Sequence, residues 1–145
     1  MVFKINLGDK GKSWKIETDN EALIGKKIGE KIEGKEIKSD LDGYELEITG
    51  TSDKAGFAGS KDIEGFALKR VLLSKGKFMK GWKKRRKKRI KVKGLRKKKT
   101  LRGNQISKDT IQINAKVIKH GHKKLEELFA EQNKPKEKKE EAKTA

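Results

Sequence analysis

The chain has 145 residues, of which 42% are charged and only 32% hydrophobic, and its formal net charge is +19. This length and composition allow one domain with one modest core, and the absence of cysteine excludes disulfides, thiolate nucleophiles and cysteine-based zinc sites. No apolar run approaches the roughly 20 residues of a membrane span, and the N-terminus lacks the apolar block of a signal peptide. We therefore expect a soluble, intracellular protein without a membrane partner.

The first residues alternate between apolar and polar side chains, as β-strands do. Phe3, Ile5 and Leu7 share one face of the first run, and Trp14 and Ile16 continue the alternation after a Gly-Asp-Lys-Gly turn. This pattern predicts two antiparallel strands joined by a short loop, with the tryptophan in the core.

The segment that follows is expected to form one or two short helical turns. Asp19 or Asn20 can cap a helix that begins at Glu21. A longer helix is disfavoured because three glycines interrupt a four-residue repeat of isoleucines. The residues of this repeat are Ile24, Gly25, Ile28, Gly29, Ile32 and Gly34.

Further strands are expected in the middle of the chain. Tyr44–Thr49 alternates, and Phe66–Leu73 is apolar and β-branched enough for a core strand. Between them, residues 50–65 are rich in Gly, Ser and Asp and predict a long loop. Gly50 and Gly56 are expected to adopt positive φ angles in this loop.

The alternation returns near the C-terminus, after a strongly basic segment. Ile111, Ile113, Ala115 and Val117 are expected to point inward along one more strand. A short helix is expected to follow, because three apolar residues then have the spacing of one helical face: Leu125, Leu128 and Phe129.

Together these elements predict a mainly β fold, a small antiparallel β-barrel with a long basic extension, short helical turns and a short C-terminal helix. Four parts are expected along the chain. They are a barrel core (1–76), a basic extension (77–103), a returning strand and helix packed on the core (104–131), and a disordered charged tail (132–145).

The positive charge is concentrated in one block of the chain. Residues 65–108 hold 20 basic and no acidic side chains, including all six arginines, whereas residues 1–64 hold 11 basic and 14 acidic ones. Such a block requires an anionic partner: nucleic acid, an anionic membrane or an acidic protein. Its density favours an extended segment lying along phosphates, where each contact releases counterions, although a nuclear-localisation patch or a general polyanion binder stays open.

The candidate RNA contacts come mostly from this block. They are Lys54, Arg70, Lys83, Lys84, Arg85, Arg86, Lys87, Lys88, Arg89, Lys91, Lys93, Arg96, Lys97, Lys98, Lys99 and Arg102. Phe78 and Trp82 precede the densest run and have two interpretations: stacking on unpaired bases, or packing of the extension onto the core.

No pattern in the sequence indicates catalysis or a cofactor. His120 and His122 form the only histidine pair, and further metal ligands are missing around it, so we expect no metal site. No serine lies in a nucleophile-elbow pattern, and the glycines near Asp9 lack the order of a phosphate-binding loop. We expect neither an enzyme nor a small-molecule substrate.

Three motifs in order resemble the ribosomal protein S6e family of archaeal and eukaryotic small subunits. They are Gly50-Thr51-Ser52-Asp53-Lys54-Ala55-Gly56-Phe57, Arg70-Val71-Leu72-Leu73-Ser74-Lys75-Gly76, and Leu101-Arg102-Gly103-Asn104-Gln105-Ile106-Ser107, which follows the basic run. The similarity spans about residues 1–118, and the chain resembles the short archaeal form because the serine-bearing C-terminal extension of eukaryotic members is absent.

The resemblance implies a β-barrel core and a structural role in the small ribosomal subunit, with small-subunit RNA and neighbouring ribosomal proteins as partners in the cytoplasm. The residues alone leave a free-standing RNA-binding or RNA-chaperone protein as an alternative. A membrane-surface or acidic-protein binder would need a basic amphipathic helix, which residues 83–99 do not show.

Overall fold

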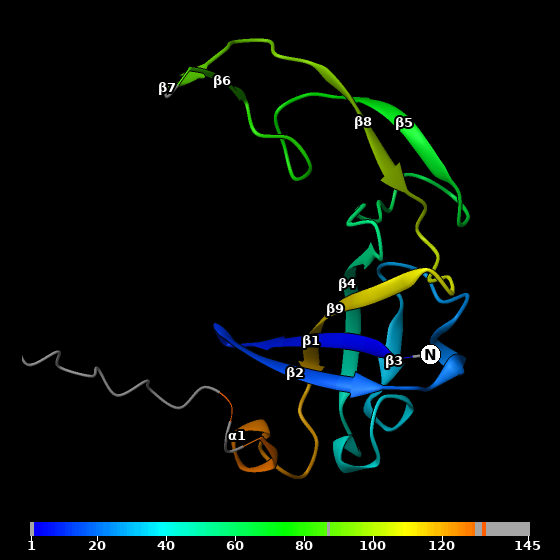
Figure 1. The fold of residues 1–145 in the computed structure, drawn as a ribbon. Helices are drawn as coiled ribbons and strands as arrows, with labels where there is room; N and C mark the ends of the chain where they lie inside the picture. Colours follow the sequence, from blue (N-terminus) through cyan, green and yellow to red (C-terminus); the bar gives the residue numbers. More distant parts are fainter. Residues whose placement is uncertain (1, 87, 130–131, 133–145) are drawn as a thin grey trace, which may run out of the picture.

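Strands dominate the computed structural model of the protein, which describes residues 2–86, 88–129 and 132. Five of them form one sheet in the order β2-β1-β9-β4-β3. The other four rise from one end of this sheet and arch away from it (Figure 1). The strands of the main sheet are β1 (Phe3–Asp9), β2 (Lys12–Thr18), β3 (Lys31–Glu33), β4 (Glu45–Asp53) and β9 (Thr110–Lys119).

The predicted N-terminal hairpin is confirmed. β1 and β2 pair antiparallel from Phe3 opposite Thr18 to Asp9 opposite Lys12. The two residues between them, Lys10 and Gly11, have φ angles of 43° and 83°. Tight hairpin turns require this left-handed conformation because it matches the twist of the flanking strands.

The sheet is open, so the predicted closed antiparallel barrel is not confirmed. β9 pairs antiparallel with β4 on one side but parallel with β1 on the other. The edge strands β2 and β3 do not pair with each other in the described part of the chain. The side chain of Gln132 covers part of the β2 edge: its amide accepts from Lys15 N at 2.7 Å and donates to Lys15 O at 2.9 Å.

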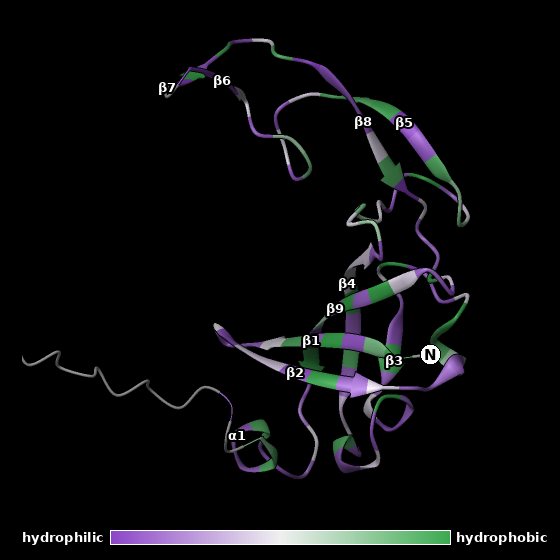
Figure 2. Cartoon of the chain, viewed as in Figure 1, coloured by the Kyte–Doolittle hydropathy of each residue, from purple (hydrophilic) through white to green (hydrophobic). Residues whose placement is uncertain are grey.

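The hydrophobic core lies on one face of the sheet. Phe3, Ile5 and Leu7 are fully buried on alternate positions of β1, and Trp14 of β2 is 2% exposed, as predicted. Burying such side chains contributes about 1.5–3 kcal/mol each. Figure 2 shows hydrophobic and hydrophilic residues alternating along these strands.

The inward row predicted for β9 is partly wrong. Ile113 and Ala115 are buried, but Ile111 is 39% exposed. The pairing of β9 with β4 shifts register here: Ser52 lies opposite Gln112 and Asp53 opposite Thr110, so Ile111 has no partner on β4 and the preceding Thr110 is buried instead.

Short helical segments cover the core, as the sequence predicts. Asn20 caps a 3₁₀ turn over Glu21–Leu23, and its Oδ1 accepts from Ala22 N at 3.0 Å. Two more 3₁₀ turns follow at Gly34–Glu36 and Ser39–Leu41. The short helix α1 (Leu125–Leu128) places Leu125 in the core with Leu128 and Phe129 packed against it, which confirms the expected helical face.

The strand expected in the core at Phe66–Leu73 lies elsewhere. β5 (Leu68–Leu73) pairs only with β8 (Lys97–Arg102), in a two-stranded ribbon outside the sheet. Leu68 and Leu72 are 45% and 52% exposed. Apolar composition alone could not reveal this, because it does not report which strand a segment pairs with.

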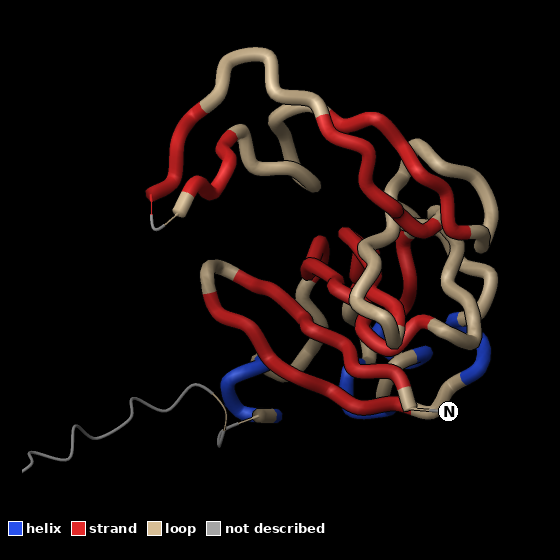
Figure 3. Tube along the Cα trace, turned by 45° about the horizontal axis from the view of Figure 1, so that its top comes forward, coloured by secondary structure: helices blue, strands red, loops and turns tan. Residues whose placement is uncertain are grey.

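The arch ends in a second small hairpin. β6 (Trp82–Arg85) pairs antiparallel with β7 (Lys88–Lys91) at the end of the arch. A view turned by 45° shows the same arrangement, with the ribbon leading from the sheet to this hairpin (Figure 3). We call β5 to β8, residues 68–102, the cationic arm.

Candidate nucleic-acid interface

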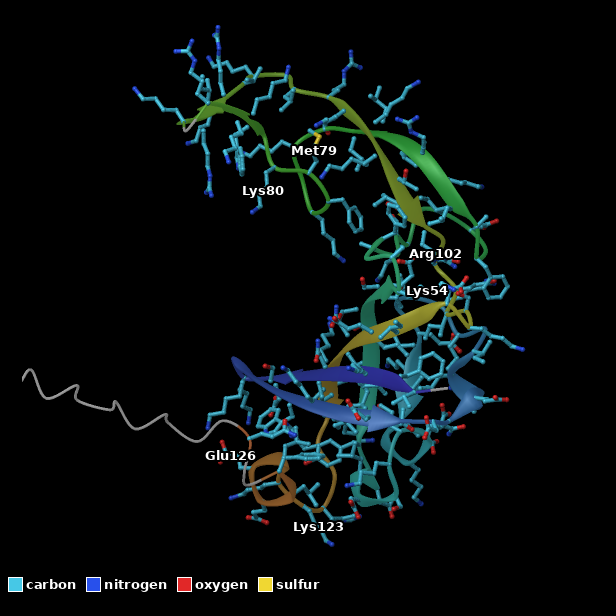
Figure 4. All side chains as sticks on the ribbon, viewed as in Figure 1. Lys54, Met79, Lys80, Arg102, Lys123 and Glu126 are labelled. Atoms are coloured by element: carbon cyan, nitrogen blue, oxygen red, sulfur yellow. The ribbon has the colours of Figure 1, made fainter. Side chains whose placement is uncertain are left out.

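The cationic arm presents its charge to solvent. Every described lysine and arginine from Lys69 to Lys99 is exposed. Side chains project from the arm on several sides, whereas Lys54 and Arg102 lie where the arm joins the sheet (Figure 4). An exposed cation keeps its hydration shell in the free protein, so folding carries no desolvation penalty for it. Such cations are suited to a segment that binds a polyanion.

The cations of the arm from Lys69 to Lys99 also lack carboxylate partners, in contrast to many lysines of the rest of the protein, which we call the body. No lysine or arginine from Lys69 to Lys99 forms an ion pair with a carboxylate of the described residues. Many lysines of the body do form such pairs, for example Lys26 with Glu36 at 2.5 Å and Lys116 with Glu47 at 2.8 Å. Most of the unpaired charge of the described residues is therefore on the arm.

The β6–β7 hairpin concentrates this charge on both of its faces. Lys84 lies opposite Arg89, and Arg85 lies opposite Lys88. Like charges directly across a strand pair destabilise it, so the hairpin gains stability when an anion lies between the cations. Arg86 begins the turn with a φ of 52°. Lys87, the next predicted contact, lies outside the described residues.

Trp82 begins β6 and already has a cation on its ring. The guanidinium carbon of Arg89 lies 4.8 Å from the ring centroid, and Lys80 Nζ lies 5.9 Å from it. These distances are those of cation–π contacts. The indole is half-buried, so part of its surface stays accessible to a partner.

Two grooves meet at this tryptophan. Trp82 and Leu95 line both of them, and each groove has a volume of about 650 Å³. One groove also contains Phe78, whose carbonyl oxygen accepts from Lys99 Nζ at 3.0 Å. An apolar floor bordered by lysines is suited to a base together with its phosphate.

The grooves include three cations that the sequence did not predict as RNA contacts. Lys75 lines one groove, and Lys77 and Lys80 line the other. They are spaced apart along the chain and precede the dense run that begins at Lys83. They belong to the same acid-free block, so the limits of that block were the signal that could have identified them.

The remaining predicted contacts of the arm lie along the ribbon and its links. Arg70 is exposed in the middle of β5, directly across from Thr100 of β8. The others are exposed too: Lys83 on β6, Lys91 on β7, Lys93 and Arg96 in the link to β8, and Lys97, Lys98 and Lys99 on β8.

Two predicted contacts differ from the rest because carboxylates already hold them. Arg102 is 12% exposed, and its Nε donates to Oδ2 of Asp53 at 3.0 Å. Lys54 Nζ lies 2.7 Å from Oδ1 of Asp109, which also faces Arg102 Nη2 at 3.5 Å. The hydrogen bond and charge of Lys54, with a smaller contribution from Arg102, lower the pKa of the Asp109 carboxyl below its ordinary value of 3.8.

The turn after β4 explains these contacts. Asp53 Oδ1 accepts from Phe57 N at 2.8 Å, and Gly56 takes a φ of 83°, as predicted. The positive φ predicted for Gly50 is wrong, because β4 continues through this residue with a register shift. The loop predicted to begin at Gly50 therefore begins after Asp53.

The opposite end of the molecule contains the histidines. His120 Nε2 lies 3.7 Å from Asp9 Oδ1, and its ring meets the edge of Tyr44. In the described part of the chain, no three carboxylates or histidines gather closely enough to hold a metal ion. None of its helices is long and apolar enough to cross a membrane.

Comparison with known proteins gives a consistent result. The sequence model of the ribosomal protein S6e family matches residues 1–130. The small ribosomal subunit protein eS6 of Methanococcus maripaludis (strain C6) is 49% identical over 123 residues, which cover 83% of this chain and 90% of that protein. The eS6 proteins of Methanothermobacter thermautotrophicus and Archaeoglobus fulgidus are 45% and 41% identical, each covering 89% of this chain and 96% of the relative.

Proposed function

Because this chain belongs to the ribosomal protein S6e family, we propose that it is a structural component of the small ribosomal subunit that binds ribosomal RNA through phosphate contacts. Its archaeal relatives are named as proteins of the small ribosomal subunit. Ribosomal RNA is the polyanion of that particle, and it matches the partner that the charge of the arm requires.

One observation carries the RNA-binding part of this proposal: the exposed lysines and arginines from Lys69 to Lys99 have no carboxylate partner among the described residues, unlike Arg102 at the base of the arm. Each phosphate contact by such a side chain releases condensed counterions, which supplies most of the sequence-independent affinity. Arginine can bind a phosphate with two parallel hydrogen bonds, whereas lysine acts as a mobile point charge.

The contacts are divided between the hairpin and the ribbon of the arm. We assign the strongest contacts to Arg85, Arg86 and Arg89 of the β6–β7 hairpin, where the cations are densest. Lys97 and Arg70 extend the contact surface along the ribbon toward the sheet. The extension therefore begins with β5, earlier than the boundary at residue 77 expected from charge.

A base-stacking contact is added at the grooves around Trp82. The half-buried indole and Phe78 border lysine-lined grooves, and an unpaired base can insert there while its phosphate meets the surrounding ammonium groups. Arg102 and Lys54 have a smaller part in RNA binding, since their bonds to Asp53 and Asp109 favour a structural role.

Sedimentation of the tagged protein from its own cells tests this function. Fractions of a sucrose gradient are probed for the protein before and after a high-salt wash. We expect salt-resistant co-sedimentation with small subunits, as for an integral component. Release to the top of the gradient at moderate salt would instead identify a free RNA-binding or RNA-chaperone protein.

A further inference from the structure

One surface of the arm has a composition unlike the rest of it. Leu68 and Leu72 of β5 are 45% and 52% exposed, and Phe66, in the bend just before β5, is 47% exposed. Residues an even number of positions apart along a strand point to the same face, so Leu68 and Leu72 lie in one row. We call these three exposed side chains the apolar strip. Figure 2 shows hydrophobic residues at both ends of β5 and hydrophilic ones in its middle.

At the base of the arm Phe66 and Leu68 line a groove together with Ile24, Arg102 and Ser107, whereas Leu72 lies outside this groove. The opposite face of the ribbon carries Leu101, which is 4% exposed, and the half-buried Val71 and Leu73. The apolar packing of the ribbon is therefore mainly on that opposite face. Exposed apolar groups that gather in a row mark an interaction surface more often than isolated ones do.

The strip is interrupted by cations. Arg70 lies between Leu68 and Leu72 on the same face, and Lys98 lies directly across from Leu72. Neither cation forms an ion pair with a described carboxylate, whereas Arg102, directly across from Leu68, is held by Asp53 and Asp109. A partner that matches this face therefore presents apolar groups and carboxylates in alternation.

The edge of β5 is available as well. β5 pairs with β8 on one side and with no strand of the described chain on the other. A free edge is a template for an added strand, whose side chains then face those of β5 directly. Cross-strand neighbours lie about 4.5–5.5 Å apart at Cβ, close enough for apolar and ionic pairs.

We propose that the free edge and the apolar strip of β5 bind an extended segment of a neighbouring protein that alternates apolar and acidic side chains. The acidic side chain pairs with Arg70, and apolar ones cover Leu68 and Leu72. This inference rests on the proposed function, because it requires a protein neighbour within an assembled particle.

Two other occupants fit the observations less well. A second copy of this chain would bring Arg70 and Lys69 against the same cations, and like charges across a strand pair repel. RNA has no row of backbone N–H and C=O groups that could pair with the free edge of β5. Its phosphates would also leave Leu68 and Leu72 without apolar contact. The cations of the β6–β7 hairpin form the surface that RNA fits.

Photo-crosslinking in assembled subunits tests the occupant. Leu72 is replaced by p-benzoylphenylalanine, and Ile90 of the cationic hairpin, which is 44% exposed, receives the same replacement as the control. After irradiation of salt-washed small subunits, we expect position 72 to crosslink to a protein peptide with alternating apolar and acidic residues. Position 90 is expected to crosslink to ribosomal RNA.

The outcomes separate this inference from the proposed function. A crosslink from position 72 to RNA or to a peptide without carboxylates, or no crosslink there, would overturn the inference alone. Failure of the protein to sediment with small subunits would overturn the proposed function, and the inference with it.

A synthetic peptide provides a second test outside the particle. The probe is a labelled peptide of alternating valine and glutamate, and lysine replaces glutamate in the control peptide. We expect the full chain to bind the glutamate peptide at least about tenfold more tightly by fluorescence anisotropy. The pair Leu68→Ser and Leu72→Ser should weaken binding of the glutamate peptide, whereas Ile90→Ser should leave its affinity unchanged. Equal affinity of both peptides for the native protein, or an unchanged affinity of the double variant for the glutamate peptide, would refute the strip as the binding surface.

Discussion

The Nε of Arg102 donates a hydrogen bond at 3.0 Å to Oδ2 of Asp53, a residue 49 positions earlier in the chain. Asp53 is 1% exposed and also accepts from Phe57 N, and Arg102 Nη1 donates to Ser107 Oγ at 3.1 Å. This network joins two of the three motifs by which the sequence resembles its family. These motif residues therefore hold the base of the arm against the sheet.

Removal of Arg102 should destabilise the protein. Arg102→Ala leaves the carboxylate of Asp53 buried without its charge partner, and such a loss costs about 3–5 kcal/mol. Urea denaturation followed by circular dichroism measures the effect. Lys98→Ala, at an exposed cation of the same strand, is the control and should change the unfolding free energy by less than about 0.5 kcal/mol. Equal stability of the two variants would contradict the structural role of Arg102.

Gly103 should not tolerate a side chain. A Cβ at this position would lie 1.8 Å from Gly65 O and 2.5 Å from its carbonyl carbon, so backbone would have to move. We expect Gly103→Ala to destabilise the protein by about 1–3 kcal/mol or more. A Cβ at Gly76 meets nothing within 4 Å, so Gly76→Ala is the matched control. Thermal melts of both variants decide the matter, and an unchanged melting temperature for Gly103→Ala would show that the close approach is absent in solution.

The hairpin arginines should set the salt dependence of RNA binding. Arg85→Ala with Arg86→Ala removes two phosphate contacts, and each contact contributes to the slope of log K against log salt about 0.9 for a duplex with the charge density of B-DNA and about 0.7 for single strands. Filter binding at several salt concentrations measures this slope. Lys27→Ala with Lys31→Ala removes two exposed cations of the body and should leave it unchanged. If both double variants behave alike, net charge rather than the hairpin controls binding.

Trp82 should respond to single-stranded RNA. Stacking of a base is worth about 1–3 kcal/mol, so Trp82→Ala should weaken binding by about fivefold to a hundredfold or more, and Trp82→Phe by less. RNA should quench the fluorescence of the native protein, and Trp82→Phe should lose this response because Trp14 is buried. Undiminished affinity of Trp82→Ala would mean that the indole only packs with Arg89.

The contribution of Asp109 to stability should depend on pH. Lys54 and Arg102 lower the pKa of this carboxyl in the folded state below its ordinary value of 3.8. A lowered folded pKa gives stability that is present above the unfolded pKa and is lost as the pH falls through the folded one. Asp109→Asn should therefore be less stable than the native protein at neutral pH, and the difference should vanish in acid. Urea titrations from about pH 7 to pH 3 measure it, and a constant difference would assign the effect to packing.

Much of the local structure follows from the sequence because it depends on neighbours in the chain. The alternation of Phe3, Ile5 and Leu7 predicts a half-buried strand, and the Asp-Lys-Gly turn sets its hairpin with β2. The cap at Asn20 and the apolar face at Leu125 are equally local. Charge also accumulates along the chain, so the composition of residues 65–108 alone locates the cationic arm.

The tertiary structure decided what depends on partners far apart in the chain. The parallel pairing of β1 with β9 joins segments about a hundred residues apart, and no local period encodes it. Nor does any local period show that the edge strands β2 and β3 leave the described sheet open. The exposure of Leu68 and Leu72 could not be predicted for the same reason. The sequence of an apolar strand does not reveal which strand pairs with it or which of its faces stays exposed. Arg102 has the composition of a phosphate contact, but the buried carboxylate of Asp53 binds it, and only the folded chain brings those two groups together.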